Sequence, residues 1–226
     1  YNTSKTVNGV ICYYYTDSSL SSCLTSGTTI TNPSKTGYTF GGYYTSTNGG
    51  GTNYINTSGT FINNLYQTAG NRTLYAKWTA NKYNISYNLN NGTKGTNAPT
   101  SANYDSVVNI SNPTKTITIT GNVNSTGATI GGTTSATQTF AGWTANNLNT
   151  STAYYGTSSS AVSTAWSNAS TKVTAQYFKN LNPTNNSTVT LTANWTPVSL
   201  KVPTISKTGY ACTWNTAADG SGTSYN

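Results

Sequence analysis

The chain repeats one string of residues three times, and this repetition limits its fold because each copy must form the same local structure. The first copy is "NPSKTGYTFGGYYTSTNGGGTNY" at residues 32–54, and a less well preserved one is "PTISKTGYACTWNTAADGSGTSY" at residues 203–225. A second copy lies between them at an offset of 100 residues from the first, so that Phe140 corresponds to Phe40. We therefore expect a string of similar small modules.

Glycine and aromatic residues recur at matching positions of the copies. Gly42 and Gly142 stand between aromatic residues, where a side chain would collide with a neighbouring strand or a bend. Because a module of this size buries a small core, its aromatic residues must carry much of its stability. The residues of this structural motif are Gly37, Tyr38, Phe40, Gly42, Tyr43 and Trp78 in the first copy, Phe140, Gly142, Trp143 and Trp195 in the second, and Gly209, Tyr210 and Trp214 in the third.

The composition favours strands. Only 6% of the residues are charged, and 21 Gly and 18 Tyr stand beside many Asn, Thr and Ser, so good helix formers are scarce. One short helix per module is still expected, because apolar residues spaced i, i+1, i+4 and i+5 follow Ser and Thr that can cap it. The predicted fold class is therefore mainly β (α+β). The helix positions are Phe61, Ile62, Leu65 and Tyr66 in the first module and Ala161, Val162, Ala165 and Trp166 in the second.

Alternating residues predict the strands. "TLYAKWT" at 73–79 closes the first module, "KVTAQYF" at 172–178 closes the second, and "TLTANWT" at 190–196 adds a further hairpin to it. A strand is also expected in "KYNISYNLNNG" at 82–92, which ends in an Asn-Gly turn.

The predicted boundaries follow from these units. Residues 1–79 are repeat module 1, residues 80–196 are repeat module 2, and residues 197–226 are the incomplete start of module 3. Module 2 carries an inserted hairpin near 117–139, where the first copy has its Gly-Tyr corner. Module 3 has the corner and the Gly-rich turn without a closing strand, so we expect the chain to be part of a longer array.

The chain resembles a known family through two runs of module 1. These are Lys-Thr-Gly-Tyr-Thr-Phe-Gly-Gly-Tyr-Tyr-Thr at 35–45 and Leu-Tyr-Ala-Lys-Trp at 74–78. They are similar to the Listeria-Bacteroides repeat, the B repeat of internalin-type bacterial surface proteins, although Tyr43 stands where the family most often has Trp. The resemblance implies tandem small β-grasp-like modules with one short helix each, placed outside the cell or on the bacterial cell surface.

The chain has little of the chemistry that an enzyme needs. It has no His and three acidic residues in all, so the usual general base is missing and no Ser-His-Asp set can form. A zinc site would need His or more than three Cys, and we expect neither cofactor nor metal. The predicted protein is not an enzyme.

Charge and hydropathy limit the kinds of partner that the chain can have. The net charge of +8 comes from dispersed Lys and the single Arg72, which is unlike the clustered basic face of a nucleic-acid binder. No stretch approaches the length and apolarity of a membrane span. The candidate partners are host or microbial glycans, proteins, and copies of the chain itself.

Cysteine and tyrosine residues near the start of the chain supply two further hypotheses. Cys12 and Cys23 flank a predicted hairpin. In a secreted protein they can form a disulfide, and the alternative is two separate thiols. The consecutive Tyr13, Tyr14 and Tyr15 must present a ring to each face of a strand, and exposed rings suit sugars or proteins, although core packing explains most Tyr. Cys212, near the position of Phe40, is expected to be a buried apolar thiol.

These observations predict a structural role. The chain would act as a spacer or stalk of a cell-surface protein, with a part in adhesion. The alternatives are a carbohydrate- or protein-binding module that uses exposed Tyr residues or the inserted segment, and a subunit of a self-assembling extracellular filament.

Overall fold

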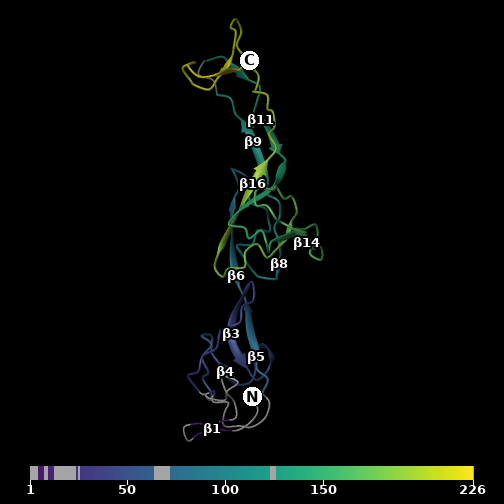
Figure 1. Cartoon of the computed structure of the whole chain (residues 1–226). Helices are drawn as coiled ribbons and strands as arrows, with labels where there is room; N and C mark the ends of the chain where they lie inside the picture. Colours follow the sequence, from purple (N-terminus) through teal and green to yellow (C-terminus); the bar gives the residue numbers. More distant parts are fainter. Residues whose placement is uncertain are drawn as a thin grey trace. The chain divides into compact units, whose positions relative to one another are not determined.

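The computed structural model describes residues 5–7, 10–12, 24, 26–63, 72–122 and 126–225 (Figure 1). Within these ranges the chain is mainly β, as predicted, and its helical part is one short 3-10 helix, η1 (Thr47–Gly49). The strands form open sheets of two to four strands. Asn, Thr and Tyr residues therefore build strands and turns here, in agreement with the composition.

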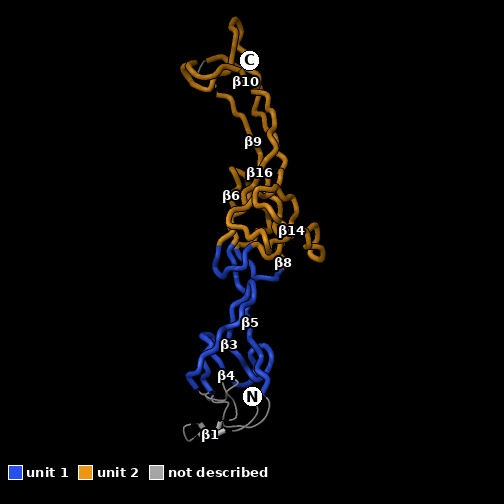
Figure 2. The backbone as a smooth tube through the Cα atoms, in the orientation of Figure 1, with its two compact units in different colours: residues 1–84, 101–106, 182–187 blue, residues 85–100, 107–181, 188–226 orange. Residues whose placement is uncertain are grey.

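The described chain divides into two compact units (Figure 2). Unit 1 holds residues 1–84, 101–106 and 182–187, and unit 2 holds residues 85–100, 107–181 and 188–226. Each unit thus gathers segments that are distant in the sequence. The predicted module boundaries after residues 79 and 196 remain predictions.

Unit 1 is built from short antiparallel pairs. β3 lies between β4 and β5, β1 pairs with β2, and the first residues of β6 pair with β7. Ile55 and Phe61 form its core cluster, against which Tyr43 and Leu74 pack. The strands are β1 (Lys5–Val7), β2 (Val10–Cys12), β3 (Tyr38–Tyr44), β4 (Asn53–Ile55), β5 (Tyr75–Ala80), β7 (Ser101–Asn103) and the start of β6 (Lys82–Asn88).

Unit 2 contains two larger sheets and three strand pairs. β16 lies between β12 and the end of β6, and the second sheet has the order β14–β13–β15–β8. The pairs are β9–β11, β10–β17 and β18–β19. The strands are β8 (Val107–Asn109), β9 (Lys115–Ile119), β10 (Thr129–Ile130), β11 (Thr134–Gln138), β12 (Phe140–Asn146), β13 (Tyr154–Gly156), β14 (Val162–Ala165), β15 (Tyr177–Lys179), β16 (Thr188–Trp195), β17 (Ile205–Ser206), β18 (Trp214–Asn215) and β19 (Ser224–Tyr225).

Three predicted strands are confirmed. β5 covers most of 73–79, β6 begins at Lys82, and β16 covers most of 190–196. The turn that follows β6 is centred one residue earlier than expected, because Asn90 and Asn91 take φ values of 47° and 64° and the Gly92 amide donates to the Leu89 carbonyl oxygen. Asn adopts this left-handed region more readily than other side chains.

The closing strand predicted at 172–178 is wrong for most of its length. Val173 makes an isolated bridge to Trp143, and a strand begins only at Tyr177. The strand that pairs with β12 is β16, whose residues Val189 and Leu191 are fully buried. Both stretches alternate in the same way, so alternation alone could not tell which of them lies beside β12.

The helix predicted at 161–166 is also wrong. Residues Val162–Ala165 form β14, which pairs with β13. The β-branched Val162 and Thr164 favour this extended backbone. In the matching stretch of module 1, Phe61 makes a β-bridge to Ile55, whereas residues 64–71 lie outside the described ranges.

Candidate functional site

Three aromatic side chains of unit 1 form a cluster on the sheet β4–β3–β5. The ring centroids of Phe40 and Tyr43 lie 5.1 Å apart at an interplanar angle of 65°, and those of Phe40 and Trp78 lie 5.7 Å apart at 60°. Such edge-to-face arrangements are favoured by the quadrupoles of aromatic rings. The cluster joins β3 to β5 because Phe40 is the direct cross-strand partner of Trp78.

Unit 2 contains the same cluster. The Phe140 ring lies 5.1 Å from Trp143 at 65° and 5.8 Å from Trp195 at 67°. Phe140 is likewise the cross-strand partner of Trp195. The nearly equal distances and angles identify β16 as the closing strand of the second copy.

A β-bulge brings the Phe and the next aromatic residue to one face of each strand. On β3, Phe40 and Tyr43 are three residues apart, but their partners on β5, Trp78 and Ala76, are only two residues apart. β12 and β16 show the same one-residue difference. Residues three apart in a regular strand point to opposite faces, and the extra residue of a bulge reverses this. The bulge is therefore what allows the cluster to form.

Gly42 and Gly142 lie in the two bulges. Their φ values are +100° and +119°, a conformation that residues with a side chain rarely adopt. A Cβ at Gly42 would collide with the carbonyl oxygen of Ile55, and one at Gly142 would lie 2.9 Å from the backbone nitrogen of Val173. The positive φ and the close approach of a neighbouring backbone segment thus account for both glycines.

The Gly-Tyr corner has the same geometry in the first and third copies. The amide of Tyr38 donates to the carbonyl oxygen of Lys35 at 3.0 Å, and the amide of Tyr210 donates to that of Lys207 at 3.1 Å. The Lys Nζ atoms lie 3.8 and 4.4 Å from the centroids of these Tyr rings. Each corner is therefore a hydrogen-bonded turn on which a Lys and a Tyr make a cation–π contact.

The two corner tyrosines differ in their surroundings. The Tyr38 hydroxyl donates to Asp105 Oδ2 at 2.7 Å, and this hydrogen bond, with burial, raises the pKa of the Tyr38 phenol. Tyr38 also makes an edge-to-face contact with Tyr104, and a Cβ at Gly37 would collide with the Tyr104 ring. Tyr210, in contrast, is 68% exposed.

The Gly-rich turn is also the same in the first and third copies. The amide of Thr52 donates to Thr45 Oγ1 at 2.9 Å, and the amide of Thr223 donates to Thr216 Oγ1 at 2.9 Å. The strands on either side of these turns pair as β3–β4 and β18–β19. The third copy therefore folds its corner and its turn as the first copy does.

Trp143 is a fully enclosed motif residue of unit 2. It is 1% exposed, and its Nε1 has no hydrogen-bond partner among the described residues, so it acts as an apolar core residue. Tyr87 lies 5.8 Å from it, and the Tyr87 hydroxyl donates to the carbonyl oxygen of Pro99 at 2.7 Å. Burial raises the pKa of the Tyr87 phenol.

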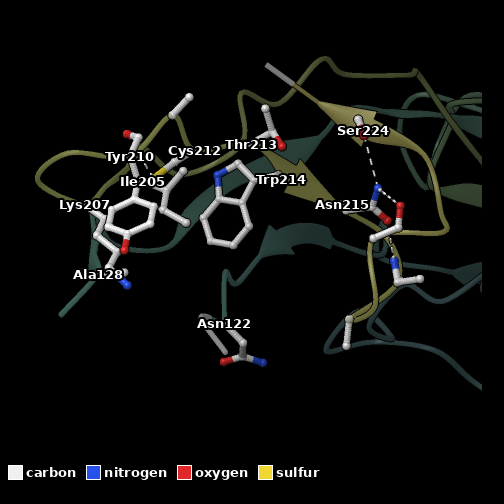
Figure 3. A pocket seen from close by; sticks show the side chains of 14 residues that line it. Asn122, Ala128, Ile205, Lys207, Tyr210, Cys212, Thr213, Trp214, Asn215 and Ser224 are labelled. Atoms are coloured by element: carbon white, nitrogen blue, oxygen red, sulfur yellow. Dashed lines mark hydrogen bonds between the residues drawn. The ribbon is translucent and has the colours of Figure 1, made fainter. Parts of the chain in front are cut away.

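Two grooves flank Trp214 in the third copy. Their volumes are about 530 and 660 Å³, and Ile205, Cys212 and Trp214 line both of them. Figure 3 shows the first groove, in which the Trp214 ring is drawn between Tyr210 on the left and Asn215 on the right. Cys212 is a free thiol of intermediate exposure and not the fully buried residue expected from the sequence.

Several predicted site residues fall outside the described ranges. These are Tyr13, Tyr14, Tyr15 and Cys23, together with the side chain of Cys12. The disulfide and the exposed tyrosine patch therefore remain predictions.

The partners of Tyr38 carried no signal in the sequence. Asp105 lies 67 residues from Tyr38 along the chain, and neither it nor Tyr104 belongs to the repeated motif. Only the fold brings these residues together.

The part of the chain that the structure describes contains no group of three or more His, Cys, Asp and Glu side chains that could hold a metal ion. In the same ranges no helix has the length and apolarity needed to cross a membrane.

Comparison with known proteins agrees with the repeat seen in the sequence. Residues 13–77 match the family model of the Listeria-Bacteroides repeat domain, which confirms the predicted repeat family. A stretch of 81 residues is 38% identical to a protein of Evansella cellulosilytica that is named as a Gly-rich membrane protein, a match that covers 35% of this chain and 9% of the relative. The chain thus spans less than a tenth of that relative. No solved structure matches the chain.

These findings define the class of protein. The findings support a repeat segment of the kind found in bacterial surface proteins, and the part of the chain that matches the Listeria-Bacteroides repeat is residues 13–77.

Proposed function

We propose that the chain is a non-enzymatic spacer or stalk segment of an extracellular bacterial cell-surface protein. The observation that carries this proposal is the aromatic cluster, which recurs with one register in two copies. In both copies the motif aromatics contact each other and hold neighbouring strands together. Residues used in this way stabilise a module, which is what a spacer requires.

The described acidic residues support a structural role. Asp105 accepts the hydrogen bond from Tyr38, and Asp219 accepts hydrogen bonds from the amide and hydroxyl of Ser221 in a turn. These hydrogen bonds from Ser221 lower the pKa of the Asp219 carboxyl, so it stays ionised as an acceptor. Asp105 thus stabilises a long-range contact and Asp219 a local turn.

The proposal includes the architecture implied by the family. The modules, with boundaries after residues 79 and 196, would be small and β-grasp-like and would lie in the surface-exposed part of the parent protein. Each compact unit gathers segments that are distant in the sequence, and this supports compact folding because such pairing buries the few apolar side chains available.

Exchange of the segment within its parent surface protein tests this function. An unrelated β-rich spacer of similar length should replace residues 1–226 with the attachment of cells to their target unchanged. The purified segment should bind no sugar on a glycan array and no protein in a pull-down. Saturable binding of a glycan or protein, or loss of attachment after the exchange, would support a binding module instead.

A further inference from the structure

The ribbon formed by β9 and β11 has a strand edge without a described neighbour. In the part of the chain that the structure describes, β9 pairs only with β11 (Figure 1). Both strands belong to unit 2 and lie well within the chain, at residues 115–119 and 134–138. One side of β9 is therefore covered by β11, and the other side is the edge considered below.

The hydrogen bonds just before β9 show which backbone groups face this edge. Thr114 and Thr93 each donate an amide to the carbonyl oxygen of the other, at 3.0 and 2.6 Å. Residues two apart in a strand direct their backbone groups to the same side. Thr116 and Thr118 therefore direct their N–H and C=O groups to the side of Thr93, away from β11.

The segment that contains Thr93 does not continue along β9. It reaches the bridge to Thr114 from the turn at Leu89–Gly92, in which the amide of Gly92 donates to the carbonyl oxygen of Leu89 at 2.9 Å. Within the described ranges, the backbone hydrogen bonds on this side of the strand end at Thr114. Residues 116 and 118 are also exposed. An edge of this kind is a template for a further strand.

The sequence of β9 fits a second copy of the same strand. Thr116 and Thr118 stand symmetrically about Ile117. An antiparallel pair with a two-fold axis at Ile117 thus places each Thr116 opposite Thr118 of the second copy. Each of these Thr pairs exchanges both of its N–H···O=C hydrogen bonds, and Thr opposite Thr is a favourable cross-strand pair.

Charge does not oppose this pairing, although the whole chain carries a net charge of +8. The one charged residue of β9 is Lys115, which in this register lies opposite Ile119 of the second copy and not opposite another Lys. Its Nζ lies 5.8 Å from the centroid of the Trp195 ring in its own chain. Residues 116–118 thus lack the Lys or Pro with which many proteins block an edge strand.

We propose that β9 pairs with β9 of a second copy of the chain, antiparallel and centred on Ile117. The two ribbons then form one sheet, with the Ile117 side chains adjacent on its half-buried face and the Thr side chains on its exposed face. A pair of five-residue strands buries less than the roughly 1,200 Å² of stable interfaces, so the contact is reversible. This self-association goes beyond the spacer role, and either can fail without the other.

A disulfide trapped across the two-fold axis tests this contact on the full 226-residue chain. In Ile117→Cys the two substituted positions form a non-hydrogen-bonded pair with Cα atoms about 4.5 Å apart, within reach of a disulfide. Oxidised glutathione is the oxidant. Mass spectrometry after digestion quantifies the 117–117 link and separates it from links of the native Cys residues.

The matched control is Ile119→Cys, on the same strand and the same half-buried face. In the proposed register its two substituted positions stand about 13 Å apart along the strands, too far for a disulfide. We expect at least about tenfold more of the 117–117 link than of the 119–119 link, since only the first pair is in reach.

Two proline substitutions in the Ile117→Cys chain locate the edge. Thr118→Pro removes an N–H that faces the second copy, and the link should fall about tenfold or more because the symmetric pair loses two hydrogen bonds. Thr137→Pro is the matched control on β11. Its N–H faces the opposite edge of the ribbon, as does the carbonyl oxygen of Thr139, which accepts from the amide of Thr196. This control should leave the link unchanged.

Four results would overturn the proposal. The first is the absence of the 117–117 link, and the second is a comparable amount of the 119–119 link. The third is an unchanged link in Thr118→Pro. The fourth is an equal loss in Thr118→Pro and Thr137→Pro, because the link would then depend on the intact ribbon and not on the edge of β9.

Discussion

At the scale of single residues, Gly41 and Gly42 are neighbours in β3, but they differ in whether the structure has room for a side chain. A Cβ at Gly42 would collide with the Ile55 carbonyl oxygen at a φ of +100°, whereas one at Gly41 would meet only the flexible side chain of Lys77 at 3.0 Å. Gly42→Ala should therefore lower the free energy of unfolding by about 2 kcal/mol or more. Gly41→Ala, the matched control, should lower it by less than about 1 kcal/mol, as measured by urea denaturation. Equal effects of the two substitutions would contradict this explanation of the bulge.

Tyr87 gives unit 2 a dependence on alkaline pH. Burial raises the pKa of the Tyr87 phenol in the folded chain above its ordinary value of 10.0. The stability that the neutral phenol contributes is complete below that ordinary value and is lost as the pH rises above it. The stability difference between the wild type and Tyr87→Phe should accordingly shrink between pH 9 and pH 11, in urea denaturation at each pH. A constant difference would show that Tyr87 does not titrate differently in the folded state.

At the scale of elements, the aromatic clusters connect a central strand to its closing strand. A double-mutant cycle of Phe40→Ala and Trp78→Ala should give a coupling energy of about 0.5–1.5 kcal/mol. The corresponding cycle of Phe140→Ala and Trp195→Ala should give a similar value, because the ring distances of 5.7 and 5.8 Å are nearly equal. A coupling energy near zero in either unit would mean that its strands are held by other contacts.

The sequence predicted these clusters better than the elements around them. The offset of 100 residues already aligned Phe40 with Phe140, and the structure gives both the same register. The helix expected at 161–166 failed because its apolar spacing fits a helix and, in part, a strand, and the β-branched Val162 and Thr164 favour the strand. Local patterns thus predicted which positions of the copies correspond, but they did not always predict whether the backbone there is a helix or a strand.

Contacts between residues that are far apart along the chain could not be predicted from the sequence. The contact of Tyr38 with Asp105 spans 67 residues and depends on how the chain gathers unit 1. The choice of β16 over 172–178 as the partner of β12 likewise depends on pairing between distant segments. No local propensity encodes such choices when two stretches alternate equally well.

At the scale of the whole molecule, the account holds that each unit is stabilised by its own aromatic cluster. Trp143 is buried within unit 2, and its truncation to Ala should cost about 3–5 kcal/mol. A loss of that size is comparable to the entire stability of a small unit. Hydrogen exchange of the full chain, followed by mass spectrometry, is the direct test, with Phe40→Ala as the mirror variant for unit 1. The account predicts that Trp143→Ala removes amide protection from β12 and β16 while β3 and β5 keep theirs. Loss of protection in both units together, or in neither, would contradict it.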